Sequence, residues 1–167
     1  MSGGIIVREG SLADVAVIAR HRVEMFREMG ELRMEDEEAL RAGAEGFLRN
    51  ALAAGRYRAW LAAPASAPGE TIAGAGAFIR SMMPRPRGDG GGVTAGDEAL
   101  VMNVFTEREH RGRGAARLLM QCVIDWARAT GIESLVLQAS PAGRPLYEQL
   151  GFVPTREMRF GRLHEFR

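Results

Sequence analysis

Apolar residues return at intervals of three and four in several long segments of this chain, a spacing typical of helices that bury one face. Ahead of the first segment, Ser11 and Asp14 stand three residues apart, as a helix-capping pair does. The strongest segment runs from 114 to 129, and Gly131 follows it. The predicted helices are 12–30, 34–52, 114–129 and a short one at 141–150.

Shorter runs of β-branched or small apolar residues separate these helices and predict strands. The run at 99–105 is apolar on both faces except at Asn103, which indicates a buried central strand. The predicted strands are 5–7, 57–63, 71–79, 99–105, one within 132–139, and 152–160. This order predicts a single α/β domain over residues 1–167: a mixed, mostly antiparallel sheet with a central parallel βαβ unit and helices on both faces.

Residues 82–98 have too little apolar content to pack, so we predict a mobile loop there. Its glycines and prolines are typical of a lid over a binding site.

Composition and charge exclude several classes of protein. The net charge is only +1, from 22 basic and 21 acidic side chains, so no global field favours nucleic acid or a membrane surface. No apolar stretch approaches the roughly 20 residues that span a bilayer, and no signal peptide is evident. Cys122 is the single cysteine and cannot form an intrachain disulfide, which fits a cytoplasmic protein. No His, Cys and Asp cluster has the spacing of metal ligands, so we expect no metal.

Two glycines and two arginines stand at the start of the strongest helix, in the segment 111–116. A helix N-terminus leaves backbone N–H groups unpaired, and glycine lets an anion approach them closely. The segment therefore predicts a phosphate site. It lacks the GxxxxGK[ST] of a P-loop, and Arg117 stands where a dinucleotide fingerprint needs its third glycine. A basic capped helix without a ligand, or an RGG-like contact to nucleic acid, are the alternatives.

The pattern Arg111-x-x-Gly114-x-Ala116 resembles the [RQ]-x-x-G-x-[GA] signature of GCN5-related N-acetyltransferases. The flanking segments LVMNVFTE, AARLLMQCVIDWA and RPLYEQLGF occur in the order found in that family. The resemblance implies a site for acetyl-CoA as acyl donor. The implied pyrophosphate contacts are Arg111, Gly112, Arg113, Gly114, Ala115 and Ala116, and the implied contacts to the pantetheine arm are Val104, Phe105, Thr106 and Ser140.

The same resemblance implies roles in catalysis. Tyr147 matches the family tyrosine that faces the coenzyme sulfur as general acid; its alternative is a packed aromatic. Leu100 stands where some members carry a glutamate that acts as general base. Glu98, two residues earlier, is therefore the candidate for a base that acts through a water molecule. Asn103 is a candidate for orienting substrate or water, or else a satisfied core amide.

For the acceptor we expect the primary amine of a small molecule, with no nucleic acid or membrane partner. A protein acetyltransferase acting on lysine or an N-terminus, and a non-catalytic acyl-CoA sensor, are the alternatives. Arg20, His21 and Arg22 are candidates to meet an acidic substrate, unless they form a solvated face. The short segment after Phe160 leaves the acceptor pocket either open at that end or completed by a second copy in a homodimer.

Overall fold

The computed structural model describes residues 4–87 and 90–158. The four predicted helices are confirmed, with ends that differ by a few residues. The capping pair forms as predicted: the Ser11 hydroxyl accepts a hydrogen bond from the Ala13 N–H, and the Asp14 carboxylate accepts one from the Ser11 N–H at 2.8 Å. The helices are α1 (Val15–Glu28), α2 (Glu37–Ala53), α3 (Ala115–Thr130) and α4 (Arg144–Gln149).

Five strands form the main sheet, in the order β1-β2-β3-β6-β7. Pairing is antiparallel from β1 to β6. The strands β6 and β7 pair in parallel, and α3 connects them along the chain. The mixed sheet and its parallel βαβ unit are therefore confirmed. The strands are β1 (Ile5–Glu9), β2 (Tyr57–Pro64), β3 (Ala73–Ser81), β6 (Asp97–Thr106) and β7 (Ser134–Leu137).

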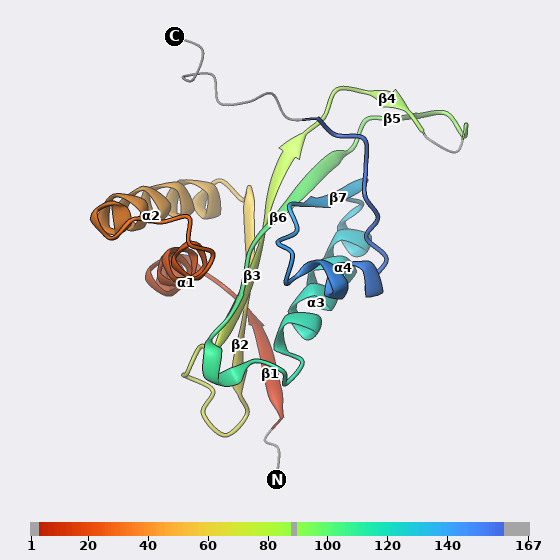
Figure 1. The fold of residues 1–167 in the computed structure, drawn as a ribbon. Coiled ribbons are helices and arrows are strands. Elements are labelled where there is room, and N and C mark those ends of the chain that lie inside the picture. Colours follow the sequence, from red (N-terminus) through yellow and green to blue (C-terminus); the bar gives the residue numbers. More distant parts are fainter. Residues whose placement is uncertain (1–3, 88–89, 159–167) are drawn as a thin grey trace.

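Two sequence predictions need correction. The strand predicted at 152–160 is wrong over its described part, because residues 152–158 form no strand. Pro154 lies in this segment and has no N–H to donate to a neighbouring strand. Residues 82–98 are not a plain loop, since β4 (Arg85–Pro86) pairs with β5 (Val93–Thr94) in a small hairpin. The hairpin stands beyond the ends of β3 and β6 (Figure 1).

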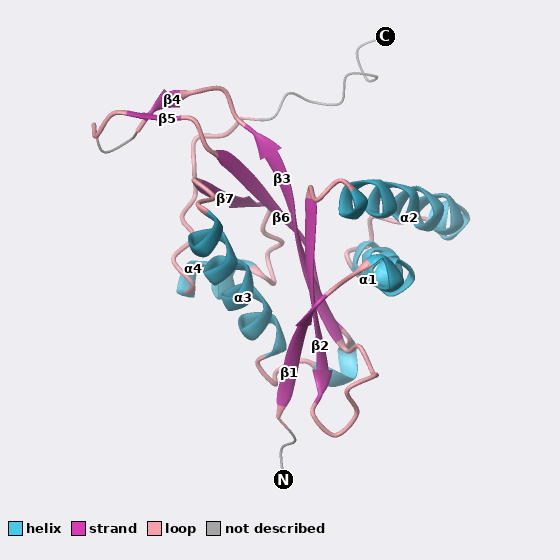
Figure 2. Cartoon of the chain, turned by 180° about the vertical axis from the view of Figure 1, so that it is seen from behind, coloured by secondary structure: helices cyan, strands magenta, loops and turns pink. Residues whose placement is uncertain are grey.

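Helices cover both faces of the sheet (Figures 1 and 2). On one face, α1 packs on β6 and β3 and α2 packs on β2, around a core that includes Leu48 and Tyr57. On the other face, α3 packs on β2, β3 and β6 around Leu119 and Val123. Small residues in β3, mostly alanine and glycine, let both layers of helices approach the sheet closely.

The neighbouring strands β6 and β7 separate partway along their length. The strand β7 pairs only with residues 98–101 of β6, and β6 continues to Thr106. A bulge lies just beyond the separation, because Gly76 pairs with Met102 whereas Gly74 pairs with Phe105. Asn103 in this bulge has φ of 56°, a left-handed conformation that asparagine tolerates better than most residues. The bulge therefore re-aims the side chains of β6 at the mouth of the opening.

Candidate functional site

Beyond Val101, the β7-facing edge of β6 has no strand partner in the described part of the chain. This edge carries Val104, Phe105 and Thr106, the residues expected to hold an extended ligand arm. Val104 packs toward the α3 side of the sheet, whereas Phe105 is buried beside the His21 ring at 5.2 Å on the α1 side. The Thr106 hydroxyl is buried and has no partner in the described residues. An unpaired backbone edge of this kind can bind a ligand as an added strand.

The glycine-rich segment forms the turn into α3. Gly112 and Gly114 have φ of 73° and 85°, conformations that favour glycine, and a Cβ on either would meet no described atom within 4 Å. The backbone N–H groups from Gly112 to Arg117 donate to no described acceptor, and the first bond into the helix is from the Leu118 N–H to the Gly114 carbonyl. Open space, unpaired N–H groups and a helix N-terminus together fit a phosphate ligand.

The two arginines of this turn differ in what they contact. Arg111 donates from Nε to the Thr106 carbonyl at 2.9 Å and forms an ion pair with Glu28, so it holds the turn against β6 and α1. Arg113 has no ion pair in the described part of the chain. It lines a groove of about 520 Å³ together with Gly4, Ile5, Gly114, Arg117, Leu118 and Gln121. The charge available to an anion at this turn therefore comes from Arg113 and from Arg117, whose side chain bonds to the neutral amide of Gln149.

Tyr147 lies on α4 and is half-buried. Its ring packs edge-on against Phe152, with centroids 6.0 Å apart, and burial raises the pKa of its phenol. The phenol thus stays protonated at neutral pH, as a proton donor must. Ser140 precedes α4, and its hydroxyl accepts a hydrogen bond from the Gly143 N–H at 3.2 Å. These contacts fix both residues in place, and the expected roles of both remain predictions.

Glu98 lies near the start of β6 and is 6% exposed. Its carboxylate accepts a hydrogen bond from Nε of Arg80 on β3 at 2.8 Å. Glu98 lies about 20 Å along the strand from Val104, at roughly 3.3 Å per residue. A proton could pass between these points only through a chain of water molecules.

Asn103 is 6% exposed and connects the sheet to α1. Its Nδ2 donates to the Tyr57 hydroxyl at 3.2 Å, and its Oδ1 accepts from Arg22 Nη1 at 2.7 Å. Tyr57 reaches Asn103 across Gly76 of β3, where a Cβ would lie 1.9 Å from the phenolic oxygen. Sequence reasoning missed both Tyr57 and Gly76, although a glycine inside a strand is a known sign of close approach.

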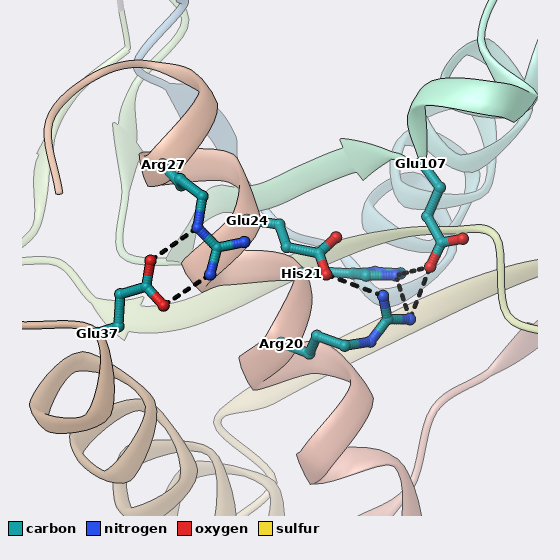
Figure 3. A network of polar contacts seen from close by, with 6 residues as sticks. All are labelled: Arg20, His21, Glu24, Arg27, Glu37 and Glu107. Atoms are coloured by element: carbon teal, nitrogen blue, oxygen red, sulfur yellow. Dashed lines mark hydrogen bonds and ion pairs between the residues drawn. The ribbon is translucent and has the colours of Figure 1, made fainter. Parts of the chain in front are cut away.

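A second polar network joins α1 to the end of β6 (Figure 3). Arg20 forms ion pairs with Glu24 and with Glu107, at 3.1 and 2.6 Å. The His21 ring nitrogen Nε2 lies 3.4 Å from the same Glu107 carboxylate, and burial lowers the pKa of His21, so its ring is neutral at pH 7. Arg20 and His21 are thus engaged within the protein, and only Arg22 of the three predicted acceptor residues lacks an acidic partner in the described chain.

The described residues contain no helix long and apolar enough to cross a membrane. Within the same residues, no three His, Cys, Asp or Glu side chains gather as a metal site would require.

Comparison with known proteins identifies relatives that match most of this chain. The model of the acetyltransferase (GNAT) family matches residues 23–152. A GCN5-related N-acetyltransferase from Ralstonia eutropha JMP134 is 28% identical, with a TM-score of 0.79 over 95% of this chain and 99% of that one. A predicted acetyltransferase from Clostridium acetobutylicum, solved with acetyl-CoA, shares the fold at 23% identity, with a TM-score of 0.80 over 97% of this chain and 98% of that one.

A curated relative, the uncharacterized N-acetyltransferase YobR of Bacillus subtilis (strain 168), is 33% identical over 60 residues. The match covers 34% of this chain and 24% of that protein, so the chain spans about a quarter of that relative's length.

Proposed function

Because the chain belongs to the acetyltransferase (GNAT) family, we propose that it transfers an acetyl group from acetyl-CoA to the primary amine of a small molecule. One observation carries this proposal: the unpaired N–H groups at the start of α3 lie at the end of a β6 edge that has no strand partner in the described chain. A coenzyme with a pyrophosphate and an amide-bearing arm is complementary to both features.

The coenzyme supplies an activated acetyl thioester. On the protein side, the backbone from Arg111 to Ala116 would hold the pyrophosphate, with Arg113 adding charge. The edge from Val104 to Thr106 would pair with the pantetheine arm as an added strand, and Ser140 would complete its contacts.

The acetyl transfer itself needs a neutral amine, a donor for the developing oxyanion and an acid for the departing thiolate. The phenol of Tyr147, kept protonated by its raised pKa, would supply the proton to the sulfur. A backbone N–H near Val104 or Phe105 would face the carbonyl oxygen. Asn103 would orient the acceptor, and Glu98 would draw the amine proton through water.

A catalytically silent acyl-CoA sensor is the second candidate. Leu100 where some members carry a glutamate, together with the engagement of Glu98 by Arg80, favours it. Such a protein would bind the coenzyme through the same turn and leave the thioester intact.

Release of free thiol from acetyl-CoA, measured across a library of primary amines, tests the proposal. We expect release with a restricted set of small amines and none without an amine. Binding of acetyl-CoA without any amine-dependent release would support the sensor instead, and efficient acetylation of folded proteins would replace the small-molecule acceptor by a protein.

A further inference from the structure

One of the three arginines on α1 has no acidic partner in the described chain. Arg20 is paired with Glu24 and Glu107, and Arg27 with Glu37 at 2.7 Å (Figure 3). The contacts of Arg22 are instead the Asn103 amide oxygen at 2.7 Å and the face of the Phe26 ring, 4.9 Å from the guanidinium carbon. Neither contact neutralises its charge.

The guanidinium of Arg22 is half-buried, a costly position for an unpaired charge. Burial lowers the pKa of Arg22 from its ordinary value, and the group stays cationic at neutral pH. A guanidinium has about five N–H donors, and Asn103 accepts from one nitrogen. The other nitrogens, Nε and Nη2, have no hydrogen-bond acceptor among the described residues, and neither is fully buried.

The orientation of this guanidinium is built into the fold. Gly76 leaves room for the Tyr57 hydroxyl, which accepts a hydrogen bond from Asn103 Nδ2. The side-chain oxygen Oδ1 of Asn103 in turn accepts one from Arg22. Asn103 itself is in the left-handed conformation of the β6 bulge. Backbone strain of this kind persists where the surrounding structure fixes it, and it is concentrated at functional sites.

The position of Arg22 is equally specific. Arg22 is hydrogen-bonded to Asn103. Asn103 comes two residues after Val101, the last residue of β6 that pairs with β7. The next residue is Val104, the start of the edge that would hold the pantetheine arm. Through Asn103, the unpaired cation is therefore held next to the start of the edge along which the acetyl group would be delivered.

We infer that Arg22 is a specificity-determining residue, which binds the carboxylate of an amine acceptor of amino-acid type. This inference rests on the proposed function. A guanidinium forms strong, paired hydrogen bonds with carboxylates. A single unpaired cation matches one negative charge, whereas a phosphate monoester would bring about −1.5 to −2. Because Arg22 is bonded to the residue next to Val104, we expect few bonds to separate the carboxylate of the acceptor from its amine.

Thiol release from acetyl-CoA tests this with a panel of L-amino acids and the matching amino-acid amides, and with O-phosphoethanolamine against ethanolamine. For the wild type we expect kcat/KM to favour the carboxylate member of each pair. Arg22→Gln should lower kcat/KM for the carboxylates by about 10- to 100-fold, with little change for the amides. Comparing the carboxylate-to-amide ratio between proteins cancels the intrinsic reactivity of each amine.

The matched control is Arg27→Gln, which removes a paired arginine from the same helix and should leave that ratio unchanged. Circular dichroism and the affinity for CoA establish that Arg22→Gln is folded, and Arg22→Lys should keep part of the preference because it keeps the charge. A ratio that is equal in wild type and Arg22→Gln, or a preference for O-phosphoethanolamine, would overturn the inference.

Failure of the proposed function is distinguishable from failure of this inference. If acetyl-CoA binds but no amine releases thiol, the same amino acids and amides are titrated into the protein–CoA complex by calorimetry. Binding of carboxylates that Arg22→Gln abolishes upholds the site without the reaction. Absence of binding by every amino acid overturns it.

Discussion

The Tyr57 side chain crosses β3 at Gly76, where a Cβ would come within 1.9 Å of the phenolic oxygen. This contact lets a residue of β2 hold Asn103 of β6 across an intervening strand. Tyr57 is 1% exposed, and burial raises its pKa to about 12, so the phenol stays neutral at neutral pH. The hydrogen bond between Tyr57 and Asn103 at the β6 bulge therefore requires that residue 76 carry no Cβ.

Gly76→Ala should destabilise the protein by about 1–3 kcal/mol, since Tyr57 must move and its bond to Asn103 is lost. Gly46→Ala is the matched control, because Gly46 lies on α2 and a Cβ at this position would meet no described atom within 4 Å. That control should stabilise by about 0.5–1 kcal/mol. Urea denaturation measures both. Equal effects of the two substitutions would contradict the close packing at Gly76.

The capping pair gives a prediction about acid. Hydrogen bonds from Arg8 and Ser11 lower the pKa of Asp14 from 3.8 to about 2. The carboxylate is therefore favoured in the folded state, and its contribution to stability is present above the unfolded pKa and is lost as pH falls toward 2. Asp14→Asn should cost about 1–2 kcal/mol at pH 7. The difference from wild type should shrink between pH 4 and pH 2.

Asp36→Asn is the control for this substitution, because Asp36 precedes α2 without forming a side-chain cap. Its effect at pH 7 should be much smaller. A difference between Asp14→Asn and wild type that stays constant down to pH 2 would show that the pKa of Asp14 is not lowered in the folded protein.

How far the sequence predicts this molecule depends on the range of the interactions involved. The Ser11 and Asp14 cap is set by residues three apart, and the glycine turn at 112–114 by neighbours in the chain, so both follow from local pattern. The strand predicted at 152–160 has a suitable local pattern up to Pro154, but a strand also needs a partner at the sheet edge. The local pattern says nothing about that partner.

The residues predicted to meet the acceptor also show that local sequence does not predict long-range contacts. The segment Arg20-His21-Arg22 reads as three similar cations in the sequence. Their different roles depend on Glu107 and Asn103, more than eighty residues away in the chain. The bulge that presents Asn103 arises from pairing with β3, which no property of residues 99–105 alone predicts.

Tyr147→Phe should lower kcat by about 10²-fold while leaving the Kd for acetyl-CoA unchanged, because only proton transfer to the sulfur is removed. The wild-type rate should fall at alkaline pH, above the ordinary range of tyrosine, since burial raises the pKa of this phenol. Steady-state thiol release measured across pH tests this. An unchanged kcat would make Tyr147 a packing residue only.

Glu98→Gln should have a smaller effect, about tenfold on kcat at most, because Glu98 would act only through a chain of water molecules. Arg80→Gln removes the other half of the ion pair and serves as the comparison. Both are expected to change stability by about 1 kcal/mol. A fall of about 10³-fold in kcat for Glu98→Gln alone would instead make Glu98 the principal base.

Calorimetric titration of acetyl-CoA tests most directly whether the turn before α3 is a coenzyme site. Wild type should bind one acetyl-CoA per chain, and Gly114→Glu should abolish binding because it places bulk and negative charge where the pyrophosphate would lie. Gly131→Glu adds the same side chain at the opposite end of α3, also at positive φ, and should bind as wild type does. Wild type without measurable affinity for acetyl-CoA, or a folded Gly114→Glu that binds it as tightly as wild type, would contradict the account.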